Sequence, residues 1–215
     1  MIVSQRRIKL FFLYCMMAYP LMMGAMCGDL FNKAKDNANI KITIERTQSF
    51  TIDVDQYMAS ANVQSQNGKI PAQAGTITVP MDIPGQTLDF RDHPDVQKYG
   101  SKLQHAKILG SVITVKSNTA NVDIPPVEIS MSPVSSESYQ VVGTFTGVPA
   151  GQTGKSESLL KTSAAIDYAS SLFVQFALKT KGKATMTLKG GQDVPKGKVT
   201  IDLNLKIQLS INPFK

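Results

Sequence analysis

Residues 199–211 read VTIDLNLKIQLSI, and apolar and polar side chains alternate along the whole stretch. The odd-numbered positions from Val199 to Ile211 are all apolar, and the even-numbered positions between them are all polar or charged. This period of two predicts a β-strand with one face on a core and the other in water. At about 3.3 Å per residue the strand spans roughly 40 Å. We therefore expect it to bend and cross between two packed sheets, or to serve both layers.

Shorter segments upstream repeat this alternation and are the other expected strands. We expect a hairpin turn at residues 181–183, which read Lys-Gly-Lys, between the last two of these segments. The segments are 40–45, 50–55, 77–83, 112–115, 127–131, 139–145, 172–178 and 184–188.

Two segments lack the alternation and are expected to be helical. Residues 93–100 follow Asp92 and carry Pro94, which suits the first position of a helix. In residues 156–170, apolar side chains recur at every fourth position, which predicts a helix of about three turns.

Strands separated by turn residues, without long helices between them, predict an all-β fold. We expect residues 40–215 to form an antiparallel β-sandwich, of the jelly-roll or Ig-like kind. It would contain about nine strands and one or two short helices.

Residues 1–26 have the features of an export signal and are not expected to belong to the fold. Arg6, Arg7 and Lys9 precede a run of 17 uncharged residues, 10–26. A basic start, an apolar run and a small-residue exit are typical of secretory signals. The run contains Pro20 and is shorter than the roughly 20 residues of a membrane-spanning helix. Residues 27–39 are small and polar, as in a tether.

The junction Gly24-Ala25-Met26-Cys27 resembles the lipobox of bacterial lipoproteins, in which the cysteine becomes the first mature residue and carries a lipid. Gly24 stands where that motif usually has Leu, and Met26 where it usually has Gly or Ala. The other cysteine, Cys15, lies inside the apolar run, so Cys27 has no partner in the mature chain. The resemblance implies a lipid on Cys27 and attachment to a bacterial membrane, at its periplasmic face or at the cell surface.

The chain has 23 basic and 16 acidic residues, a formal charge of +7. Removal of the signal leaves about +4, and the excess lies after residue 155. These lysines are candidates for contact with anionic headgroups or with an anionic envelope polymer. The alternative is that they are exposed lysines that discourage pairing between sheet edges. Arginine and interleaved aromatics are missing from this part, so we expect no nucleic-acid partner. The candidate residues are Lys179, Lys181, Lys183, Lys189, Lys196 and Lys198.

Residues 149–156, PAGQTGKS, resemble a phosphate-binding P-loop, but Pro149 replaces the first glycine. Proline has no amide hydrogen to donate to a phosphate. We therefore expect no nucleotide, and read the segment as a glycine-rich loop in which Ser156 caps the following helix.

Asp89, Asp92 and Asp95 surround His93 and are weak candidates for a calcium site. No EF-hand spacing is present, and carboxylates are equally natural at a helix start. His93 and His105 are too few for an ordinary zinc site, and no G-x-S-x-G motif is present. We therefore expect no metal, no cofactor and no enzymatic activity.

These features together favour an exported, lipid-anchored envelope protein with a non-enzymatic structural, adhesive or accessory role. Its expected partners are the membrane, through Cys27, and an anionic envelope polymer or another protein. One alternative is a module that binds a lipid or small ligand in a cavity between its sheets. The other is an outer-membrane β-barrel, suggested by the long C-terminal strand.

Overall fold

The computed structural model describes residues 40–173 and 176–212, which form two antiparallel four-stranded sheets. The first sheet has the order β1-β8-β3-β6 and the second β2-β7-β4-β5. The strands of the first are β1 (Ile40–Asp53), β8 (Lys198–Ile211), β3 (Leu103–Asn118) and β6 (Ser156–Ser158). The strands of the second are β2 (Thr76–Asp89), β7 (Ala177–Lys189), β4 (Val127–Pro133) and β5 (Gln140–Phe145). The predicted all-β sandwich is confirmed, and its eight described strands have a jelly-roll arrangement.

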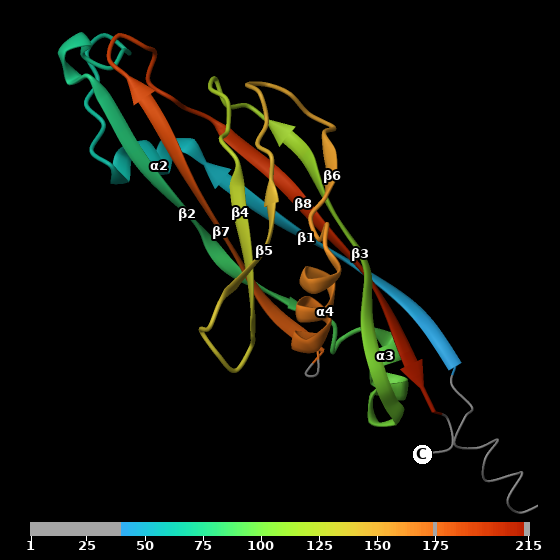
Figure 1. Ribbon diagram of the computed structural model, residues 1–215. Coiled ribbons are helices and arrows are strands. Elements are labelled where there is room, and N and C mark those ends of the chain that lie inside the picture. The colour runs from blue at the N-terminus through green and yellow to red at the C-terminus, as the bar shows by residue number, and fades with distance from the viewer. Residues whose placement is uncertain (1–39, 174–175, 213–215) are drawn as a thin grey trace, which may run out of the picture.

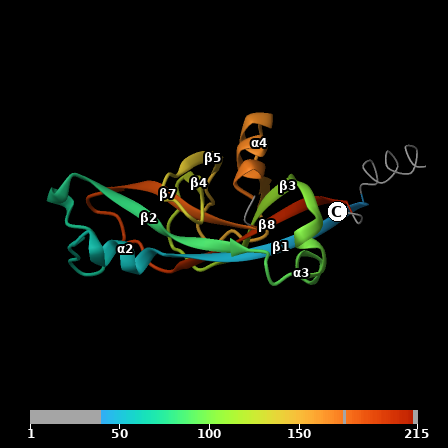
Figure 2. The ribbon, with the colours of Figure 1, turned by 90° about the horizontal axis from the view of Figure 1, so that it is seen from below.

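The molecule is elongated, and the long strands of both sheets run along its length (Figure 1). At one end, β1, β8 and β3 extend beyond the second sheet towards α3 (Pro94–Tyr99). In the perpendicular view α4 (Ser163–Leu172) stands out on one side of the sheets (Figure 2).

The alternation along residues 199–211 is confirmed as the inner and outer faces of β8. The apolar positions are at most 2% exposed, because they all point into the core. The strand does not cross between sheets, however: it lies between β1 and β3, and its register with β1 is unbroken from Ile40↔Ile211 to Asp53↔Lys198. The irregularities that bend this sheet lie in its pairing with β3, where the register shifts three times.

The helix predicted near His93 is confirmed as α3, which begins at Pro94. The Nδ1 atom of His93 accepts a hydrogen bond from the Asp95 amide at 3.3 Å and so caps this helix. A further helix that the alternation did not predict, α2 (Val54–Ser60), follows β1 directly. Two 3₁₀ turns, η1 (Ala72–Ala74) and η2 (Gly100–Lys102), complete the helical elements of the described residues.

The second predicted helix begins later than expected. Ser156–Ser158 pair with β3 as β6, so the prediction that Ser156 caps the helix is wrong. The cap of α4 is Thr162, whose Oγ1 accepts a hydrogen bond from the Ala165 amide at 3.2 Å. The strand expected from residue 172 starts only at Ala177, because Leu172 still belongs to α4.

The hairpin predicted at residues 181–183 is wrong, because these residues lie inside the continuous strand β7. Gly182 serves close packing instead of a turn. A Cβ at this position would lie 2.9 Å from Cδ1 of Ile83 and 3.1 Å from Cγ1 of Val127. Residues 40–45 and 50–55 likewise merge into the single strand β1 up to Asp53. The two mergers reduce the nine expected strands to seven, and β6, which was not predicted, brings the number in the described part to eight.

The two sheets stay open, with β1 and β6 as the edges of one and β2 and β5 as the edges of the other. The outer-membrane barrel is therefore wrong as a description of residues 40–173 and 176–212. No helix in this part of the chain is long and apolar enough to cross a membrane. The predicted signal, Cys27 and the tether lie outside the described residues.

Candidate functional site

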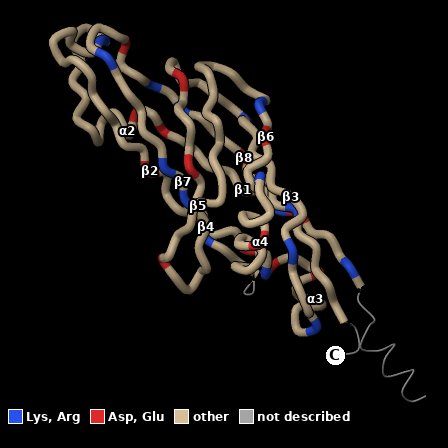
Figure 3. Tube along the Cα trace, viewed as in Figure 1, with Lys and Arg blue, Asp and Glu red and all other residues tan. Residues whose placement is uncertain are grey.

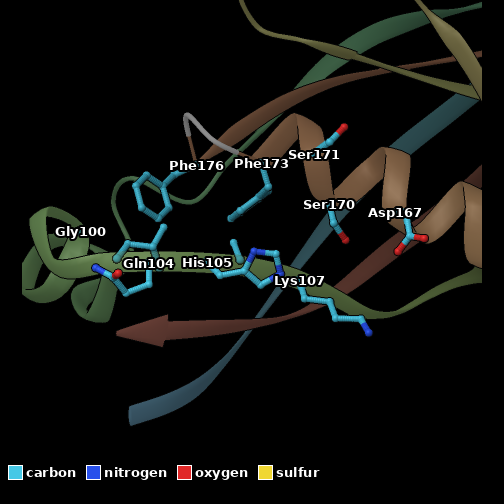
Figure 4. Close-up of a pocket in the computed structure, with 11 residues that line it drawn as sticks. Gly100, Gln104, His105, Lys107, Asp167, Ser170, Ser171, Phe173 and Phe176 are labelled. Atoms are coloured by element: carbon cyan, nitrogen blue, oxygen red, sulfur yellow. The ribbon is translucent and has the colours of Figure 1, made fainter. Parts of the chain in front are cut away.

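A pocket of about 600 Å³ opens between α4 and the first residues of β3 (Figure 4). Phe173 and Phe176 form its apolar end, and Lys107 and Asp167 lie at the other end. His105 lies between these two ends. No sequence pattern indicates this pocket, because its two walls come from distant segments, residues 100–107 and 167–176.

The apolar end of the pocket rests on a chain of aromatic contacts. The rings of Phe90 and Phe173 are both fully buried and meet edge to face at 4.7 Å, and Phe176 follows at 6.1 Å. Phe176 has a φ of +54°, which is rare for a bulky residue. Its amide donates to the Phe173 carbonyl at 3.0 Å, and its carbonyl accepts from the Phe90 amide at 2.8 Å. These bonds hold the half-buried Phe176 ring at the pocket.

The serine hydroxyls in the pocket are already committed to structural hydrogen bonds. Ser170 Oγ donates to the Ile166 carbonyl at 2.6 Å and accepts from the Ile108 amide at 3.0 Å, which fastens α4 to β3. Ser171 Oγ donates to the Tyr168 carbonyl at 2.6 Å. Neither hydroxyl is hydrogen-bonded to His105, the arrangement that would activate it as a nucleophile.

The space between the two sheets is filled by side chains. The cavity found there, beside Phe50, Ile83 and Ile129, measures about 10 Å³, close to the volume that one water needs. The described residues therefore show no cavity of ligand size at this place. The α4–β3 pocket lies outside the sandwich core.

Lys179, Lys181 and Lys183 share the outer face of β7, as their spacing predicted. The ammonium of Lys179 forms an ion pair with Glu137, which raises the pKa of Lys179 and lowers the pKa of Glu137. The ammonium of Lys181 lies 4.0 Å from the centre of the Tyr139 ring, a cation–π contact. These two lysines therefore already have partners within the chain.

Lys183 lies between two acidic neighbours, since Asp82 of β2 and Glu128 of β4 are its partners in the sheet. Figure 3 shows basic and acidic positions mixed around β7. Lys198 lies elsewhere, at the start of β8, where its ammonium contacts Asp53 at 2.8 Å. Lys189 ends β7, and Lys196 belongs to the loop before β8. Of the six candidate lysines, the structure thus places Lys179, Lys181, Lys183 and Lys189 on the outer face of β7, and Lys196 and Lys198 outside that strand.

The three candidate metal ligands, Asp89, Asp92 and Asp95, each interact with a different basic side chain. Asp89 receives hydrogen bonds from the Arg91 guanidinium, and Asp92 receives one from Arg46 at 2.7 Å. Asp95 lies 3.8 Å from Nδ1 of His93. Within the described ranges, no group of three or more His, Cys, Asp or Glu side chains is arranged to hold a metal ion.

Hydrogen bonds from Arg91 lower the pKa of Asp89 to about 2. A carboxyl whose pKa is lower in the folded state stabilises the fold above its unfolded pKa of about 4, and this contribution is lost as the pH falls towards 2. We expect Asp89→Asn to lower the free energy of unfolding at pH 6 by at most about 1 kcal/mol, because the pair is partly solvated. Urea unfolding at pH 6, 4, 3 and 2 should show the difference from wild type shrinking. Arg91→Gln removes the same pair and should follow the same profile, whereas a difference independent of pH contradicts the assignment.

Lys155 of the P-loop-like segment is turned back onto the chain. Its ammonium donates to Thr146 Oγ1 at 2.8 Å and to the Gly147 carbonyl, and it lies 5.4 Å from the centre of the Phe145 ring. Lys155 thereby fixes the end of β5 and is not presented to a phosphate.

The strand orders and the filled core define a two-sheet jelly-roll protein. No protein-family model matches the chain, and no curated protein does. Among solved structures, that of mud crab tombus-like virus is similar over 81% of this chain and 84% of its own, with 10% identity and a TM-score of 0.37. That of Desmodium yellow mottle tymovirus is similar over 81% and 90%, with 9% identity and a TM-score of 0.31. Likenesses this remote carry no argument about function.

Proposed function

We propose that the chain is an exported, lipid-anchored, non-enzymatic protein of a bacterial envelope, with a structural, adhesive or accessory role. The observation that carries the proposal is Cys27, which directly follows the uncharged run 10–26 and is the single cysteine after it. Lipidation accounts for this cysteine, which has no second cysteine after the uncharged run with which to form a disulfide.

The position of the sandwich supports a tethered module. The first described strand begins at Ile40, at the end of the molecule where β1, β8 and β3 extend beyond the second sheet (Figure 1). The segment 27–39 reaches at most about 45 Å when fully extended. The filled core and the committed hydroxyls of Ser170 and Ser171 favour a role in association over one in catalysis. Because Lys179 and Lys181 already have partners within the chain, a protein is the favoured partner over an anionic polymer.

Metabolic labelling with palmitate in a bacterial host tests the anchor. We expect the wild-type chain to carry the label, Cys27→Ser to lose it, and Cys15→Ser, the matched control within the apolar run, to keep it. Globomycin, which blocks cleavage of lipoprotein signals, should cause the uncleaved wild-type precursor to accumulate. An unlabelled wild-type chain, or a label that persists in Cys27→Ser, rules out the proposed anchor.

A second candidate function, the binding of a small ligand, is favoured by the α4–β3 pocket. The aromatic end at Phe176 suits an aromatic ring, and Lys107, which shares the other end with Asp167, offers a partner to an anionic group. Anilinonaphthalene sulfonate has this chemistry and serves as the probe. We expect Phe176→Ala to weaken its binding at least fivefold, and Val141→Ala, at an exposed apolar residue of β5, to leave it unchanged. Equal binding by both variants contradicts this candidate.

A further inference from the structure

Three of the four sheet edges in the described residues carry features that prevent pairing with another chain. β6 has only three residues, and the pairing of β5 with β4 is interrupted by a register shift. β2 carries Pro80 and Pro84 and has an irregularity after Ile83. Short strands, prolines and bulges are the devices by which natural proteins protect sheet edges.

The fourth edge, β1, has none of these devices. It runs for 14 residues without a proline, and its pairing with β8 has no irregularity. No described strand pairs with its other side. Two side chains of β1 form hydrogen bonds towards the second sheet. Gln48 donates to Gln86 of β2, and Arg46 donates to Asp92 in the loop that follows β2. Both side chains are half-buried and lie on the inward-facing positions of β1, and Arg46 is there a charged side chain of the kind that also discourages edge pairing.

The sequence of β1 is complementary to itself in one antiparallel register. With Thr47 of one copy opposite Thr47 of the other, Lys41 faces Asp53 and Thr43 faces Thr51. Glu45 then faces Ser49, and on the inner side Ile42 faces Ile52. Opposite charges thus meet at both ends of the strand, where Asp53 also contacts Lys198 of its own chain, and no like charges meet.

Neighbouring registers are less favourable. Centring the pair on Glu45 or on Arg46 places two like charges directly opposite each other. Centring it on Ser49 places Glu45 opposite Asp53, and centring it on Gln48 leaves Lys41 beyond the paired strands without an acidic partner. Because side chains alternate along a strand, the two outer faces join only in registers centred on a residue. The Thr47 register pairs residues 41–53 and leaves none of these conflicts.

We propose that β1 pairs antiparallel with β1 of a second copy of the chain, centred on Thr47, to form a twofold-symmetric dimer. The two first sheets join into one sheet of eight strands, with the order β6-β3-β8-β1 followed by its reverse. An interface of this kind uses the same surface on both subunits, and closure of the pair removes the exposed edge. This inference does not depend on the lipid anchor.

The first test is the mass of the full chain in solution, measured by light scattering. We expect wild type to have about twice the chain mass of 23.3 kDa. Thr47→Lys puts two lysines opposite each other and should weaken dimerisation at least tenfold, as should Thr47→Glu. An equimolar mixture of the two variants should regain the dimer, which shows that both are folded. The control is Thr200→Lys, in a residue enclosed between β1 and β3 in the same sheet, which should leave the dimer intact.

Disulfide cross-linking of the full chain tests the register. Facing residues of an antiparallel pair have Cα atoms about 4.5–5.5 Å apart, within the range that a disulfide bridges. We expect Thr47→Cys to form a cross-linked dimer on oxidation, above the background that Cys15 and Cys27 set in wild type, and Thr200→Cys to stay at that background. A monomeric wild type, or a Thr47→Lys variant as dimeric as wild type, overturns the proposal. More cross-linking by Thr43→Cys than by Thr47→Cys overturns the register.

Discussion

Gly197→Ala is expected to lower the free energy of unfolding by about 3 kcal/mol or more. Gly197 has a φ of +101°, outside the regions that residues with a side chain occupy readily. A Cβ at this position would lie 2.3 Å from the Thr119 carbonyl oxygen and 2.7 Å from its carbon. Strain and a backbone collision therefore act together.

The loop that meets Gly197 cannot easily withdraw. The amide of Thr119 donates to the Lys198 carbonyl at 2.8 Å, and Thr119 Oγ1 accepts from the Lys198 amide at 3.0 Å. Gly197 itself is tied to α2, since its amide donates to Asp55 and its carbonyl accepts from the Val54 amide. A shift of this loop would break the contacts that hold the start of β8.

Gly191→Ala is the matched control for this substitution. Gly191 has a φ of +85°, but an added Cβ meets no atom within 4 Å. Only the backbone strain remains, so the expected loss is about 1 to 2 kcal/mol. Urea unfolding of both variants separates the two causes, and equal losses would show that the contact with Thr119 does not matter.

Leu205→Ala is expected to cost about 3 kcal/mol, within the range measured for buried leucines in other proteins. Leu205 is fully buried in the middle of β8, where both neighbouring strands are paired with it. The substitution removes buried apolar contacts and leaves a cavity that the paired backbone cannot close by moving.

Leu109→Ala provides the same chemical change on the same sheet. Leu109 of β3 is 43% exposed, so its truncation removes little buried surface and leaves no cavity. We expect a loss below about 1 kcal/mol. Denaturant unfolding monitored by circular dichroism gives both values, and similar losses in the two variants would contradict the inward register of β8.

The faces of the strands could be predicted from the sequence, but their ends could not. Alternation is a local property, and in β8 it identified every buried position from Val199 to Ile211. The ends depend on distant residues. Gly182 was predicted as part of a turn, but it lies within β7 because Ile83 and Val127 occupy the space that a Cβ would fill. Ser156 was predicted as a helix cap, but it pairs with Thr114 of β3.

For the candidate sites, too, local spacing could be predicted from the sequence, but contacts with distant residues could not. Spacing placed Lys179, Lys181 and Lys183 on one face, but Glu137 and Tyr139, which bind two of them, come from the loop before β5. The α4–β3 pocket could not be predicted from the sequence. Its two walls are brought together by tertiary contacts such as the hydrogen bond from the Ile108 amide to Ser170 Oγ.

The sequence by itself determined the sandwich class, the inward face of β8, the start of α3 at Pro94, and the export and anchoring hypothesis at Cys27. These follow from side-chain periodicity and from short motifs, which act over a few residues. The tertiary structure alone decided which strands are neighbours, which charges are matched, where the pocket lies, and that β1 is a long edge strand without proline or bulge. Those properties depend on contacts between residues far apart in the chain, and such contacts exist only after the two sheets have formed and packed.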